Sequence, residues 1–175
     1  MDVTVITPTI PERAELLTQA IASVAHQVEP AAAHLIGVDC KREGPTPVRN
    51  RLLKSVNTEW VAFLDDDDIF YPQHFQVVSQ HLDSADLIYT WCNSEGRDGF
   101  NPNSYFDEQR LRGGNYIPIT VTLRTSKLRE VGGIPDERLE DWALWIKLLD
   151  AGARFVCEPT VTWNYRFLGG NRTFS

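Results

Sequence analysis

Hydrophobic and polar residues change their spacing several times along the first half of the chain. Residues 3–7, VTVIT, are rich in β-branched side chains and stop at a proline, as a buried strand does. Over residues 12–28 the apolar positions instead recur every three or four residues, which indicates an amphipathic helix. The same alternation continues, with strands expected at 34–39, 59–64 and 85–91 and helices expected at 47–55 and 72–82.

The second half contains one clear helical pattern. Residues 139–151, LEDWALWIKLLDA, have helical apolar spacing, two acidic residues in the first turn and a glycine just beyond the end. Alternation predicts a strand at 117–124, and two short closing strands are expected at 155–157 and 160–165. Residues 93–116 have little periodicity and many Gly, Asn, Asp and Ser residues, which is typical of a binding loop or lid.

Alternating strands and helices predict an α/β fold with a mainly parallel central sheet flanked by helices. A length of 175 residues fits a single domain over 1–175. Ligands of such sheets gather at the carboxyl ends of the strands. The loops at 8–11, 39–44 and 65–68 are therefore expected at one edge of the sheet.

Composition and charge narrow the class of protein. Hydrophobic residues make up 42% and charged residues 23%, and the formal net charge of −7 comes with no basic stripe, so a nucleic-acid partner is not expected. No apolar run reaches the ~18 residues of a transmembrane helix, and the first residues lack the pattern of a signal peptide. The three cysteines are few, odd in number and far apart, so we expect no disulfide framework and a cytoplasmic location.

Four consecutive aspartates, Asp65 to Asp68, follow the apolar residues 59–64 directly. Alternate side chains of a strand point to the same side, so Asp65 and Asp67 could face one ligand. Carboxylates select hard cations such as Mg²⁺ or Mn²⁺, which bridge protein oxygens and substrate phosphates. The alternative is a solvated acidic turn or the start of a helix, and a helix start would account well for Asp68.

Three further charged features have two interpretations each. Glu140 and Asp141 either stabilise the start of the helix at 139–151 or supply a general base aimed into a cleft. Arg49 is either a surface charge or a phosphate ligand. Arg166 and Arg172 flank a Gly-Gly turn that is either a phosphate-binding flap or a frayed terminus. The four histidines fall within helix or strand patterns and are interpreted as structural or surface residues.

In their order and spacing, three long stretches resemble the family-two glycosyltransferases of the GT-A fold. The opening strand, Pro-Thr turn and first helix of that family match VTVITPTIPERAELLTQAIASVAHQ. The helix, strand and D-x-D region match VRNRLLKSVNTEWVAFLDDDDIFYPQHF. The acceptor half with its Glu-Asp pair matches GGNYIPITVTLRTSKLREVGGIPDERLEDWALWIKLLDAGARFVCEP. The resemblance covers most of the chain.

The resemblance implies a role for each matching position on the donor side, residues 1–92. Asp39 would contact the nucleotide base, and Asp67 would hold a Mn²⁺ or Mg²⁺ ion on the diphosphate. The residues implied to bind the nucleotide sugar are Thr7, Pro8, Thr9, Asp39, Arg49, Asp65 and Asp66.

On the acceptor side, residues 93–175, Asp141 matches the base that deprotonates the acceptor hydroxyl, and Glu140 would position the acceptor. The resemblance therefore implies a metal-dependent, inverting hexosyltransferase that uses a nucleotide-diphosphate sugar, with a uridine diphosphate sugar as the expected donor. Two departures are visible: Asp39 continues into Cys40-Lys41-Arg42, and the tail has no counterpart of the family's C-terminal histidine. A nucleotidyltransferase of related fold and a catalytically silent nucleotide- or glycan-binding domain remain alternatives.

Overall fold

The computed structural model describes residues 1–95 and 102–166 of the chain. The strands are β1 (Val3–Thr9), β2 (Ala33–Val38), β3 (Trp60–Phe63), β4 (Ile69–Phe70), β5 (Leu87–Glu95), β6 (Thr122–Arg124) and β7 (Phe155–Arg166). The α-helices are α1 (Ala14–Ala25), α2 (Pro45–Leu53), α3 (His74–Val78), α4 (Glu108–Gly113), α5 (Thr125–Glu130) and α6 (Glu140–Asp150), and the 3-10 helices are η1 (Pro11–Arg13) and η2 (Ser79–His81).

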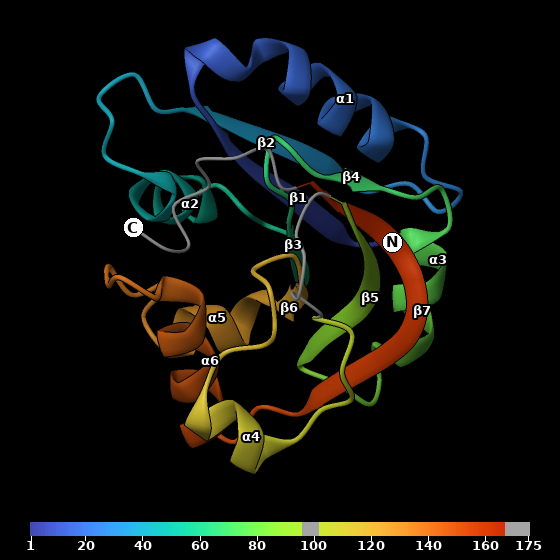
Figure 1. The fold of residues 1–175 in the computed structure, drawn as a ribbon, viewed down its shortest axis with the longest axis vertical. Coiled ribbons are helices and arrows are strands. Elements are labelled where there is room, and N and C mark those ends of the chain that lie inside the picture. The colour runs from blue at the N-terminus through green and yellow to red at the C-terminus, as the bar shows by residue number, and fades with distance from the viewer. Residues whose placement is uncertain (96–101, 167–175) are drawn as a thin grey trace.

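The strands form one seven-stranded sheet in the order β2-β1-β3-β6-β5-β7-β4 (Figure 1). Its long ladders are parallel: β1 pairs with β2 from Thr4 to Thr9, β1 also pairs with β3, and β5 pairs with β7 over its whole length. The antiparallel contacts, β3 with β6, β5 with β6 and β4 with β7, each join only two or three residue pairs. The predicted mainly parallel sheet is confirmed.

Helices cover both faces of the sheet (Figure 1), and the alternation of side chains along β3 explains why. Trp60 and Ala62 belong to a hydrophobic core shared with α1 and α3. Val61 and Phe63 belong to a second core shared with α2, α5 and α6. A strand whose side chains are buried on both sides reads as a continuous apolar run, which is why this strand was recognisable in the sequence.

The strand predicted at 117–124 begins only at Thr122, so that prediction was wrong over its first five residues. Pro118 has no N–H to donate to a ladder. The N–H of Ile117 bonds the side chain of Asn115, and the N–H of Val121 bonds the carbonyl of Ile119 in a γ-turn. These local bonds take the place of strand pairing for the N–H groups of Ile117 and Val121, although the carbonyl of Val121 still accepts the N–H of Phe63.

The two short strands predicted near the C-terminus are one strand, β7. Pro159, which cannot donate a ladder hydrogen bond, lies between the two predicted strands. In the structure the register shifts there, with Thr90 opposite Glu158 and Trp91 opposite Val161. The bulge accommodates the proline while the pairing continues on both sides.

Three short elements were not predicted: β4, α4 and α5. Each has at most six residues, too few for a period to be visible in a sequence. The helix α4 lies within the stretch 93–116 that was expected to be irregular.

No helix in the described part of the chain is long and apolar enough to cross a membrane. The cytoplasmic location stays a prediction.

Candidate active site

The carboxyl ends of β1 and β2 are joined by a hydrogen bond from the N–H of Asp39 to the carbonyl of Thr9, 2.7 Å. Thr7 and Pro8 are buried within β1. The Thr7 hydroxyl lies 2.8 Å from Nε2 of His34, so the Thr7 side chain is engaged within the sheet. Burial lowers the pKa of His34 to about 4. Of this predicted trio, the Thr9 side chain is the one that reaches the acidic turn.

Asp39 closes the loop that follows β2. Its carboxylate accepts the N–H groups of Glu43 at 3.0 Å and Gly44 at 2.7 Å, and Gly44 has a φ of 96°, which favours glycine. Burial alone would raise the pKa of Asp39, but these N–H donors outweigh it and lower the pKa. Asp39 is therefore an ionised carboxylate that holds the loop leading into α2.

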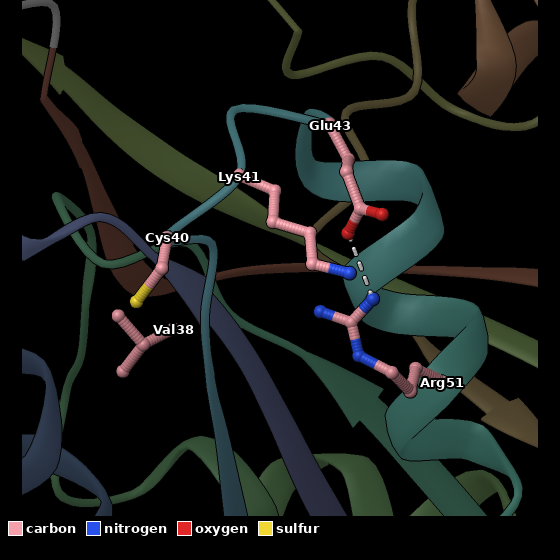
Figure 2. A pocket seen from close by; sticks show the side chains of 5 residues that line it. All are labelled: Val38, Cys40, Lys41, Glu43 and Arg51. Carbon is pink, nitrogen blue, oxygen red and sulfur yellow. Dashed lines mark hydrogen bonds and ion pairs between the residues drawn. The ribbon is translucent and has the colours of Figure 1, made fainter.

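A hollow of about 290 Å³ adjoins this loop (Figure 2). Val38, Cys40, Lys41, Glu43 and Arg51 line it, and Glu43 and Arg51 form an ion pair of 3.0 Å across it. Three of the five side chains that line it, Lys41, Glu43 and Arg51, carry charge.

The four aspartates form a tight turn after β3, closed by a hydrogen bond from the N–H of Asp68 to the carbonyl of Asp65, 3.2 Å. Asp65, Asp67 and Asp68 each offer a carboxylate oxygen, and these oxygens all lie within 4.8 Å of one another. Asp66 points elsewhere: it accepts the Thr9 hydroxyl at 2.7 Å and the guanidinium of Arg13 at 2.9 Å. The turn therefore groups the carboxylates of Asp65, Asp67 and Asp68 and directs that of Asp66 toward other partners.

Burial is the main cause of the unusual electrostatics of the turn. It raises the pKa of Asp67 to about 6, with a further increase from the charge of Asp65 and an opposing effect of Arg13. The pKa of Asp68 is raised well above its ordinary value, again first by burial and then by Asp65 and Asp67. A cation placed among these groups would offset both effects.

Asp68 does not support the start of a helix, as the sequence had suggested, because α3 begins only at His74. It is 1% exposed and accepts the backbone N–H of Arg166 at 2.9 Å. The Arg166 side chain donates to the carbonyl of Asp67 and, at 2.6 Å, to Gln19. The last residue of β7 thus holds the acidic turn, while Arg172 lies outside the described residues.

Arg49, on α2, is 2% exposed and lies at the centre of the site. Its guanidinium pairs with Asp65 and lies 3.6 Å from Oε1 of Glu140. Within the described residues, its Nε and Nη1 atoms have no hydrogen-bond partner. A buried arginine with unused donors is well suited to bind an anion.

Glu140 and Asp141 form the first turn of α6, as predicted. Asp141 accepts hydrogen bonds from the Asn115 side chain and from the N–H of Trp142, both at 2.8 Å. Burial and the neighbouring charge of Glu140 raise the pKa of Asp141 to about 6, although the two hydrogen bonds and Arg49 oppose the shift. A carboxylate with a raised pKa is a better proton acceptor than an ordinary aspartate.

The residues present fit a divalent metal ion at the acidic turn. Three carboxylates converge, oxygen is the donor that Mg²⁺ and Mn²⁺ prefer, and the raised pKa of Asp67 shows the energetic cost that a cation would relieve. Asp67 was the predicted metal ligand, and the geometry groups it with Asp65 and Asp68. The assignment of Asp65 and Asp66 to the nucleotide stays a prediction.

Two side chains at the site were not singled out from the sequence, Arg13 and Asn115. Asn115 lies in the stretch 93–116, which has no periodic pattern, and Arg13 lies near the start of the predicted helix at 12–28, where a charged residue is ordinary. Only the folded chain brings them to the carboxylates. The histidines were interpreted from the sequence as structural or surface residues, and His74 is structural: it stacks on Phe70 and lies 2.7 Å from the Thr162 hydroxyl.

The family model for glycosyl transferase family 2 matches residues 36–133, more than half of the chain. The chain belongs to glycosyltransferase family 2. The matched segment contains Asp39, Arg49 and the acidic turn. The predicted family membership is confirmed.

Two curated relatives are uncharacterized glycosyltransferases of Rickettsia felis and Rickettsia conorii. They are 24% and 23% identical to this family-2 chain over 77% of its length. The chain spans only 24% of the length of each relative.

Two solved structures share the fold of this family-2 chain. TarS 1-349 of S. aureus, solved in complex with UDP-GlcNAc, has a TM-score of 0.81 and 17% identity, covering 99% of this chain and 60% of TarS 1-349. The mannosyltransferase PcManGT of Pyrobaculum calidifontis, solved with GDP-Man and Mn²⁺, has a TM-score of 0.70 and 18% identity, covering 93% of this chain and 56% of the other. The predicted GT-A fold is confirmed.

Proposed function

We propose that this chain transfers a sugar, with inversion, from a nucleotide-diphosphate sugar to an acceptor hydroxyl. The observation that carries the proposal is the position of Arg49, which contacts Asp65 of the acidic turn and lies 3.6 Å from Glu140 at the start of α6. The acidic turn and the first turn of α6, which carries the candidate base Asp141, thus lie on either side of one buried cation. Residues 1–92 would bind the donor and residues 93–175 the acceptor.

The donor site would lie over the carboxyl ends of β1, β2 and β3. Asp39 would contact the base, and the unused N–H donors of Arg49 could bind a phosphate oxygen. TarS binds UDP-GlcNAc and PcManGT binds GDP-Man, which supports a nucleotide sugar as the donor class. A uridine diphosphate sugar is the first donor to test.

Asp67, with Asp65 and Asp68, would hold Mn²⁺ or Mg²⁺. When bound, the ion neutralises the charge that grows on the leaving diphosphate. The presence of Mn²⁺ in the PcManGT structure supports this cofactor.

Asp141 would take the proton of the acceptor hydroxyl as that oxygen attacks the anomeric carbon. The bond between the anomeric carbon and the phosphate oxygen breaks, and its electron pair leaves with the nucleoside diphosphate. Glu140 would position the acceptor. Asn115 keeps the Asp141 carboxylate oriented through its 2.8 Å hydrogen bond.

Product analysis tests the proposal. Nucleotide sugars are first screened by thermal shift with Mn²⁺, since a ligand that binds the folded state stabilises it. Donors that bind are then incubated with candidate acceptors. Release of free nucleoside diphosphate supports sugar transfer, release of pyrophosphate would favour a nucleotidyltransferase, and binding without turnover would favour a silent binding domain.

The transfer rate should depend on pH through Asp141. Its pKa of about 6 lies above the ordinary value, so the ionised base becomes fully populated only above pH 6. At saturating Mn²⁺, kcat should fall about tenfold per pH unit below 6 and should be level between pH 7 and 8. A kcat that stays constant down to pH 4.5, with the protein folded, would remove Asp141 as the base.

Replacing Asn115 with alanine should move the acid limb of that profile to higher pH. The Asn115 N–H stabilises the ionised form of Asp141, so its loss raises the pKa of the base by about 0.4–1 unit, the equivalent of one hydrogen bond of about 0.5–1.5 kcal/mol. The measurement is the pH dependence of kcat for both proteins. A lower plateau with an unmoved limb would contradict the assigned contact.

A further inference from the structure

The proposed transfer leaves Arg13, the last residue of η1, without a role. Its Nη1 atom lies 2.9 Å from Oδ1 of Asp66 and 3.1 Å from Oδ2 of Asp67. The Arg13 side chain is 34% exposed, whereas those of Asp66 and Asp67 are 4% and 6% exposed. A cation at the rim of the site therefore reaches inward to two buried carboxylates.

The acidic turn needs such a cation when no metal ion is bound. Its like charges repel one another strongly because water is partly excluded, and burial already raises the pKa of Asp67 and Asp68. Arg49 pairs with Asp65, and the backbone of Arg166 binds Asp68. Of the ion pairs found among the described residues, those of Arg13 are the ones that reach Asp66 and Asp67.

The contact with Asp67 conflicts with a divalent ion on the same carboxylate. Two cations at one carboxylate repel each other, and the guanidinium uses one of the two oxygens that Asp67 could offer to a metal. Arg13 can give way more easily than Arg49, because its side chain is 34% exposed and can move into solvent, whereas that of Arg49 is 2% exposed.

We propose that Arg13 is the resting counter-cation of the acidic turn and competes with the divalent ion for Asp67. In the metal-free protein Arg13 occupies the carboxylate, and metal binding displaces it. This inference rests on the proposed metal site, and it assigns a positioning role to a residue outside the transfer chemistry.

The proposal makes an unusual prediction for Arg13→Gln. Removing a competitor should tighten the binding of Mn²⁺ alone, with no nucleotide present, by about 2–5-fold, the equivalent of one partly exposed ion pair. The same variant should melt at a lower temperature in chelator, because the repulsion within the turn is no longer offset. A merely structural role for Arg13 has the opposite sign for the metal, because a loosened turn binds Mn²⁺ more weakly.

The test measures free Mn²⁺ by electron paramagnetic resonance during titration of the wild type, Arg13→Gln, Arg13→Lys and Arg42→Gln. Arg42 forms an exposed ion pair with Glu12, 2.6 Å, and serves as the matched control with unchanged affinity. Arg13→Lys keeps the charge but lacks the broad planar guanidinium, so it should tighten binding less than glutamine does, and it provides a second measurement if Arg13→Gln does not fold.

Unchanged or weaker Mn²⁺ binding by both folded Arg13 variants, with a wild type that binds, would overturn this inference and leave the proposed function standing. A wild type that binds no Mn²⁺ in the absence of nucleotide would overturn this inference, while the product analysis tests sugar transfer separately. Tighter binding by Arg13→Gln, with Arg42→Gln unchanged, is the result that we expect.

Discussion

Replacing Asp141 with asparagine should lower the transfer rate by roughly 10²–10⁴-fold while nucleotide-sugar binding is retained. Asparagine has nearly the shape of aspartate and can keep a contact with Asn115, but it cannot accept the acceptor proton. The measurement is kcat for sugar transfer, together with the dissociation constant of the donor by calorimetry. Loss of donor binding in parallel with kcat would argue against a base on the acceptor side.

The stability of this variant separates a catalytic effect from unfolding. The pKa of Asp141 is raised from its ordinary value of 3.8 to about 6 in the folded protein, so its ionisation opposes folding. This cost is absent below about pH 4, grows between about pH 4 and 6, and is complete above about pH 6. A neutral asparagine removes this cost, so Asp141→Asn should melt at the same or a higher temperature at pH 8. Asp150→Asn, at the exposed end of the same helix, is the matched control and should transfer at the wild-type rate.

Replacing Asp67 with asparagine should abolish stimulation by Mn²⁺ or Mg²⁺ and lower the transfer rate by about 10²-fold or more. A bound metal contributes several kcal/mol to the stabilisation of charge in the transition state, and each ~1.4 kcal/mol corresponds to a factor of ten. Turnover is measured with each metal and with chelator, and the wild type should lose activity in chelator to a similar extent.

The rise in melting temperature that Mn²⁺ causes in the wild type should also disappear in Asp67→Asn, because the ligand no longer stabilises the folded state. Asp83→Asn, an exposed aspartate, should keep both responses. Full activity of Asp67→Asn in the presence of chelator would remove Asp67 from the metal role.

Much of the fold was predictable because the sheet is buried on both faces and its helices are amphipathic. Apolar runs marked β1, β3 and β5, and the helical period marked α1 and α6 to within a few residues. The errors fell where a local bond replaced a ladder, as before Thr122, or where a bulge hid a continuous strand, as at Pro159. The first depends on local hydrogen bonds that the apolar pattern does not record, and the second depends on pairing with β5, which is distant in the sequence.

The candidate site, like the fold, was predictable only in part. Asp65, Asp67, Arg49 and the Glu140–Asp141 pair were all chosen from the sequence: the run of four aspartates after an apolar strand indicated a cation site, and the resemblance to the family implied roles for Arg49 and the Glu140–Asp141 pair. Their separate functions in donor binding, metal binding and proton transfer stay predictions.

By itself the sequence determined the order of the main strands and helices, the family and the presence of a dense acidic turn. Tertiary structure alone decided which carboxylates share a site. The Asp66 carboxylate contacts Thr9 and Arg13, and the Asp68 carboxylate accepts the backbone N–H of Arg166. Arg49 lies between the turn and α6. The physical reason is that a carboxylate's charge, pKa and partners depend on burial and on groups up to ninety-eight residues away, such as the backbone N–H of Arg166 at Asp68, and no local pattern records those contacts.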